Sequence, residues 1–115
     1  MTTPFSMIRD INGFNSFALP NSDIKYSALL LEDVPQQISI PISEKEWVII
    51  FSYEDGSSVW VSINAPATYP VGAVSPTTSE LKPTARLVRG GDTISFITGD
   101  STADIGMTLY SLERP

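Results

Sequence analysis

The chain has no cysteine and no histidine among its 115 residues. Without cysteine it cannot form a disulfide or a thiolate metal site, and without histidine it lacks the commonest metal ligand and the commonest general base. It also has no G-x-S-x-G segment of the kind that activates a serine nucleophile. These absences exclude most enzyme chemistry, so we expect that the chain is not an enzyme.

Positive charge and long apolar runs are also scarce. Seven basic residues stand against thirteen acidic ones, which gives a net charge of −6, and the basic residues form no cluster. A negative chain repels phosphate backbones, so nucleic acid is not an expected partner. Every apolar run ends well before the roughly 18 residues that a membrane span needs, and the first residues do not resemble a secretory signal. We therefore expect a soluble protein without a membrane partner, made and kept in the cytoplasm.

The rest of the composition is typical of one folded domain. An apolar fraction of 42% and a charged fraction of 17% exclude a disordered chain, and 115 residues suffice for one core. The pattern changes near residue 25, where period-two alternation begins. We predict an N-terminal arm over residues 1–24 and a β-sandwich domain over residues 25–115.

Apolar residues recur in the first region at intervals of three. The interval suits a helix, but Pro4, Asn12-Gly13 and Pro20 interrupt it. We predict an extended arm whose apolar side chains bind a partner, and the alternative is that they cover one edge of the chain's own core. The residues concerned are Phe5, Ile8, Ile11, Phe14 and Phe17.

Short candidate strands separated by turn residues fill the second region. Pro41 cannot donate to a ladder, so the strand over 36–42 should lie at a sheet edge or end there. The strand over 47–53 is apolar on both faces, which predicts a central position. Asp55-Gly56 and Gly99-Asp100 predict two hairpins. The remaining candidate strands cover residues 26–32, 58–64, 92–98 and 103–112, with a short one near 87–88.

A proline-rich loop over residues 65–86 separates these strands. Its prolines predict a stiff segment that presents a contact surface. Trp60 falls on the outward face of its strand, Tyr69 lies in the loop, and Arg86 is placed to pair with Glu80 at the loop's base. About seven or eight strands in this layout predict an all-β fold, a jelly-roll-like β-sandwich with an extended N-terminal arm.

The acidic residues suggest two further kinds of site. Paired carboxylates could run glycoside hydrolysis, but Glu32-Asp33, Glu44/Glu46 and Glu54-Asp55 lie at strand ends or turns, where solvated acids are usual. Asp100 and Asp104 with loop carbonyls could hold calcium, although their spacing matches no EF-hand. We expect no catalytic, cofactor or metal site.

Several segments together resemble the small capsid decoration, or cement, proteins of tailed bacteriophages. The segments are WVIIFSY (47–53), VWVSIN (59–64), APATYPVGAVSP (65–76), SELKP (79–83) with Arg86 after it, ISFIT (94–98) and TLYSL (108–112). The resemblance covers a little over half of the chain and includes no catalytic motif.

The resemblance implies a jelly-roll-like sandwich on the capsid surface of a virion. Its partner would be the major capsid protein, and it would act as a homotrimer that ties neighbouring capsomers together. Two alternatives stay open: a tail, head-fibre or baseplate subunit of similar build, and a carbohydrate-binding module in which Trp60 and Tyr69 stack on sugars. Under the leading interpretation the expected interface residues are Phe5, Ile8, Ile11, Phe14, Phe17, Trp60, Tyr69 and Arg86.

Overall fold

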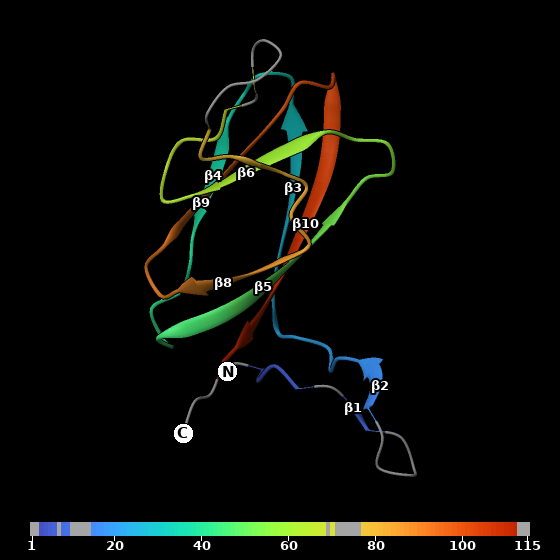
Figure 1. Cartoon of the computed structure of the whole chain (residues 1–115), viewed down its shortest axis with the longest axis vertical. Helices are drawn as coiled ribbons and strands as arrows, with labels where there is room; N and C mark the ends of the chain where they lie inside the picture. The colour runs from blue at the N-terminus through green and yellow to red at the C-terminus, as the bar shows by residue number, and fades with distance from the viewer. Residues whose placement is uncertain (1–2, 7, 10–14, 69, 71–76, 113–115) are drawn as a thin grey trace.

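The computed structural model describes residues 3–6, 8–9, 15–68, 70 and 77–112. In these residues the chain is all-β, with two antiparallel four-stranded sheets that face each other and a separate two-stranded sheet below them (Figure 1). This bears out the expected β-sandwich. The described part of the chain contains no helix that is long and apolar enough to cross a membrane.

Each large sheet combines strands from the first and last thirds of the domain. The first sheet has the order β3-β10-β5-β8, and the second has the order β4-β9-β6-β7. The first comprises β3 (Ile24–Leu31), β10 (Thr102–Ser111), β5 (Glu46–Tyr53) and β8 (Ala85–Arg89). The second comprises β4 (Gln36–Ser39), β9 (Thr93–Thr98), β6 (Val59–Ile63) and β7 (Glu80–Leu81).

Period-two alternation decides which side chains enter the core. In β5, Trp47, Ile49 and Phe51 are buried while the residues between them are only partly buried. The indole of Trp47 donates to the Pro41 carbonyl at 3.0 Å, so its one polar group is satisfied inside the sandwich. The prediction that this strand is central is confirmed, because β10 and β8 pair with its two edges.

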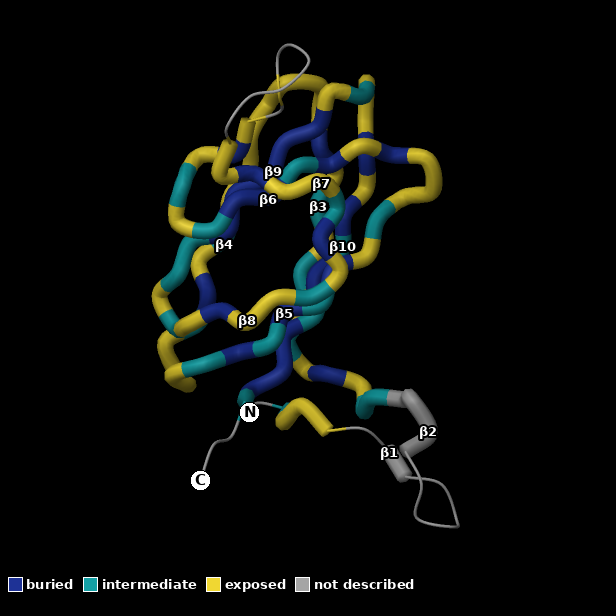
Figure 2. Tube along the Cα trace, viewed as in Figure 1, coloured by how far each residue is buried: buried dark blue, intermediate teal, exposed yellow. Residues whose placement is uncertain are grey.

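One apolar cluster fills the space between the sheets. In Figure 2 the buried residues lie along β9, β10 and β5. As expected, β4 is an edge strand and ends before Pro41. The buried members of the cluster are Leu30, Ile40, Trp47, Ile49, Phe51, Val59, Val61, Val88, Ile94, Phe96, Ala103, Ile105, Met107 and Leu109.

The two predicted hairpins are wrong. A turn does form at Asp55-Gly56, where Gly56 has φ +76° and the Ser57 amide donates to the Glu54 carbonyl at 3.1 Å. However, β5 continues in the first sheet and β6 in the second, and β9 and β10 are divided in the same way. Both turns therefore carry the chain across the sandwich, because the flanking strands find their hydrogen-bonding partners elsewhere in the sequence.

Crossing between sheets is the rule in this chain. From β3 to β10, every connection between consecutive strands passes from one sheet to the other, except the one from β6 to β7. The crossing connections contact one another in pairs. Beyond the end of β5, the Ser58 amide donates to the Asp100 carboxylate at 2.7 Å and the Thr98 hydroxyl donates to the Ser58 carbonyl at 2.7 Å. Below the start of β5, the Gly90 amide donates to the Lys45 carbonyl at 3.0 Å.

The N-terminal region is tied to the sandwich at both of its ends. Thr3 and Phe5 exchange backbone hydrogen bonds with Ser111 at the end of β10, at 2.8 and 2.9 Å. The Ser22 hydroxyl, which is buried, donates to the Leu109 carbonyl. Between these ties the chain forms β1 (Ile8–Arg9) and β2 (Asn15–Ala18), which pair with each other away from the large sheets (Figure 1). The region therefore contains a strand pair instead of running out as a single extended arm.

The contact between crossing connections gives a stability prediction at Gly90. A Cβ added there would lie 2.5 Å from the Glu44 carbonyl oxygen and 3.0 Å from that of Pro41, and both are backbone atoms that cannot swing away. We expect Gly90→Ala to lower the free energy of unfolding by about 1–3 kcal/mol, toward the upper end of that range. Urea unfolding would measure the loss.

Gly56→Ala is the matched control. It places a methyl group in open space and costs only its positive φ, about 1 kcal/mol. Equal losses in the two variants would mean that the close approach at Gly90 does not constrain the fold.

Candidate binding surfaces

Phe5 packs on the chain's own sandwich. Its ring meets the ring of Tyr110 edge to face, with centroids 5.9 Å apart and planes at 83°. The Tyr110 hydroxyl donates to the Pro20 carbonyl at 2.7 Å, so both ends of the N-terminal region cover this tyrosine. Phe5 still has 37% of its surface exposed. Much of the Phe5 side chain is therefore buried against the chain's own sandwich, as the alternative for the arm predicted.

The other apolar residues predicted for the arm are less fully described. Ile8 lies in β1 and Phe17 in β2, for which the backbone alone is described. Ile11 and Phe14 fall outside the described residues. The surface that these four were expected to form stays a prediction.

Trp60 lies on the outer face of the second sheet. It lies directly opposite Ile97 on β9 and Leu81 on β7 in the strand register, so the three side chains share that face. Ile97 is 8% exposed, Trp60 is half-buried and Leu81 is 53% exposed. Trp60 and Leu81 therefore form an apolar ridge beside the long loop.

Serine and threonine hydroxyls hold the described parts of the long loop over the same sheet. The Ala67 amide donates to the hydroxyl of Ser95 at 3.1 Å, and the Thr68 amide donates to that of Ser79 at 3.0 Å. Both serines are buried. Prolines alone predicted a stiff loop, whereas this anchoring depends on serines whose role the sequence did not reveal. Tyr69 falls outside the described residues.

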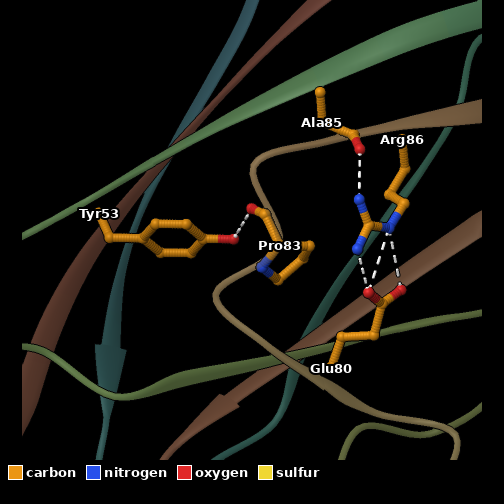
Figure 3. Close-up of polar contacts among 5 residues, drawn as sticks. All are labelled: Tyr53, Glu80, Pro83, Ala85 and Arg86. Carbon is orange, nitrogen blue, oxygen red and sulfur yellow. Dashed lines mark hydrogen bonds and ion pairs between the residues drawn. The ribbon is translucent and has the colours of Figure 1, made fainter.

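Arg86 pairs with Glu80, as predicted (Figure 3). Its Nε lies 3.1 Å from both carboxylate oxygens, its Nη2 forms an ion pair with one of them, and its Nη1 donates to the Ala85 carbonyl at 2.6 Å. The hydrogen bond from Arg86 lowers the pKa of Glu80. Because β8 and β7 are edge strands of different sheets, the pair joins the two sheets at one side of the sandwich.

Tyr53 reinforces the same side of the sandwich. Its hydroxyl donates to the Pro83 carbonyl at 2.6 Å (Figure 3), and the Lys82 ammonium lies 5.8 Å from its ring centroid. Burial raises the pKa of the Tyr53 hydroxyl well above its ordinary value. Lys82 has φ +47°, which turns the chain from β7 toward β8. This cluster fixes the base of the loop.

The outer face of the first sheet carries an apolar patch that the sequence analysis did not identify as a surface. Val48 lies directly opposite Leu87, and Ile50 lies directly opposite Ala85, so the four side chains lie together on β5 and β8. Leu87 is 49% exposed, and the other three are partly exposed. In the sequence, 47–53 is apolar on both faces, a pattern that predicts a central strand and that also contains half of this patch. We call these four residues the outer patch.

The acidic residues do not assemble a metal site in the described part of the chain, where no group of three or more candidate ligands gathers. The Asp100 carboxylate accepts from the Ser58 amide and holds two crossing turns together. Asp104 lies on the exposed outer side of β10. The calcium alternative, which also uses loop carbonyls, stays an alternative.

Comparisons with models of known protein families, with curated proteins and with solved structures found no match.

The Arg86–Glu80 pair gives a pH-dependent prediction. Because the folded pKa of Glu80 is lowered, the pair's contribution is present above the ordinary carboxyl pKa and is lost as pH falls through the folded value. Both side chains are exposed, so we expect a coupling energy of only about 0.2–1 kcal/mol at pH 7. A double-mutant cycle with Glu80→Gln and Arg86→Met, repeated in acid, would measure it. Coupling that persists after Glu80 is protonated would contradict this account.

Tyr53 should respond at the opposite end of the pH scale. Its folded pKa is raised, so its contribution is complete below the ordinary phenol pKa of 10.0 and declines as pH rises toward the folded value. We expect Tyr53→Phe to cost about 0.5–1.5 kcal/mol at pH 7 by removing the bond to Pro83. The deficit should shrink above pH 10 in unfolding experiments. A deficit that stays constant above pH 10 would show that folding does not raise the pKa of the hydroxyl, and no deficit at any pH would show that Tyr53 acts through its ring alone.

Proposed function

We propose that the chain is a structural virion protein that binds the outer surface of a bacteriophage capsid and ties neighbouring capsid subunits together. Its partner is the major capsid protein. The resemblance of residues 47–112 to cement proteins motivates this proposal. The β-sandwich is the architecture that the resemblance implies, and so it supports the same assignment.

The strand order supports a jelly-roll-like interpretation of the sandwich. Jelly rolls are double sheets of eight strands, and viral capsid domains use them. Here β3 to β10 divide equally between two sheets, and the chain crosses from one sheet to the other at all but one connection. This wrapping leaves part of each outer face available for contacts.

The observation that carries the proposal is the presence of apolar side chains on both outer faces. The outer patch lies on the first sheet, and the ridge of Trp60 and Leu81 lies on the second. Leu87 and Leu81 are about half exposed, at 49% and 53%. A protein that ties two neighbours together needs at least two contact surfaces, and these two point in opposite directions.

Modest contacts suffice for this task. A shell displays many copies of its binding site, and each bound copy that engages two neighbours gains from the high effective concentration of the second site. A preformed surface adds to this gain because little ordering is needed on binding. The bonds around Arg86, Tyr53 and Ser95 keep the face beside Leu81 in one shape.

Binding to undecorated heads of the phage that encodes the chain tests this proposal. We expect saturable co-sedimentation of the purified chain with heads. Leu87→Lys and Leu81→Lys should each weaken binding by roughly tenfold or more, because each brings a charge into an apolar contact. Ile42→Lys is the control, since Ile42 is 83% exposed and lies in the β4–β5 connection outside both surfaces.

Three outcomes would count against the proposal. They are no saturable binding to heads, binding to tails alone, and equal weakening by all three variants. Binding to tails would favour the alternative of a tail or baseplate subunit.

A further inference from the structure

β3 presents a long edge to which nothing pairs in the described part of the chain. It has eight residues, and all of them are in continuous register with β10, from Ile24 opposite Leu109 to Leu31 opposite Thr102. Its other side is the end of the first sheet. No proline or register shift interrupts it, and Lys25 is the only charged residue within it. Such an edge is a template for another strand.

The other edge strands of the two large sheets, β4, β7 and β8, carry more protection than β3, whose one charged residue is Lys25. β4 has only four residues and is flanked by Pro35 and Pro41, and β7 has only two residues. β8 carries Arg86 and Arg89 and follows Pro83. Short strands, prolines and charged side chains are the usual devices that prevent edge-to-edge pairing. β3 is the longest of the four edges and the least protected.

The β3 edge is complementary to itself when turned end for end. Asp23 and Lys25 stand at its start, and Glu32 and Asp33 follow its last residue. A parallel pair of β3 strands would place the two acidic ends together, whereas an antiparallel pair brings Lys25 of each copy to the acidic end of the other. The Lys25 ammonium donates to the Asn21 side-chain oxygen.

Exposed apolar residues lie along the same edge. Leu29 is 59% exposed and Leu31 is 50% exposed, and both project from the outer face of β3. In an antiparallel pair the outer faces of the two copies become continuous, so these leucines can cover one another across the junction. Backbone bonds would supply affinity, and the leucines and charges would select the orientation.

We propose that β3 of one copy pairs antiparallel with β3 of a second copy, so that the two first sheets become one continuous sheet. The contact uses the same surface on both copies and closes after two. It goes beyond the proposed function, because it requires no capsid. It also differs from the trimer that the resemblance implies, and a molar mass distinguishes the two.

The first test is the molar mass of the whole chain by light scattering and sedimentation over a series of micromolar concentrations. We expect a concentration-dependent monomer–dimer equilibrium. Leu29→Lys should raise the dissociation constant by roughly tenfold or more, because lysine on an edge opposes strand addition. Ile42→Lys makes the same change at a more exposed site away from β3 and should leave the equilibrium unchanged.

Charge reversal tests the orientation. Lys25→Glu and Glu32→Lys should each weaken self-association, because each places like charges together twice in the pair. An equimolar mixture of the two variants should associate as tightly as the parent or more tightly, since both contacts in the mixed pair again join opposite charges. Circular dichroism would check that each variant keeps its β-structure.

The outcomes separate the two proposals. A monomer at every concentration, a mass of three chains, or equal effects of Leu29→Lys and Ile42→Lys would overturn pairing through β3. Two weak variants that do not rescue each other would overturn the antiparallel arrangement. Because no heads are present, none of these results bears on capsid binding.

Discussion

The structure depends on one topological constraint, which is that consecutive strands from β3 to β10 lie in opposite sheets, with β6 and β7 as the one exception. Each sheet is therefore assembled from strands that are distant in sequence, and β3 and β10 are the extreme case. Local turns cannot supply these pairings, so the apolar core between the sheets must hold them together. The hydrogen bonds between paired crossing turns, such as Ser58 to Asp100, then fix how the two sheets meet.

Sequence patterns predicted the strands well and their partners poorly. Apolar residues on both faces marked 47–53 as a central strand, and Pro41 marked an edge, because both effects act within a single strand. An Asp-Gly pair specifies a tight turn, but it does not specify which strands bond on either side. That choice depends on the competition among all strands for partners, which no local pattern contains.

Among the candidate surfaces, too, some features were predictable from the sequence and others were not. The Arg86–Glu80 pair was predictable because the two residues are close in sequence at the base of one loop. The outer patch was not predictable, because it requires that β5 and β8 are neighbours and that their apolar residues lie opposite one another. The two outer faces and the β3 edge together give the molecule three separate surfaces, built on strands whose positions the core determines.

Among the described strands β3 pairs only with β10, which has a consequence for synthesis on the ribosome. The chain emerges from its N-terminus, so β3 leaves the exit tunnel long before its partner has been translated. Throughout that interval both sides of the strand offer unpaired peptide groups and exposed leucines. The nascent chain thus passes through a stage at which neighbouring polypeptides on the same messenger compete with its own C-terminal strand.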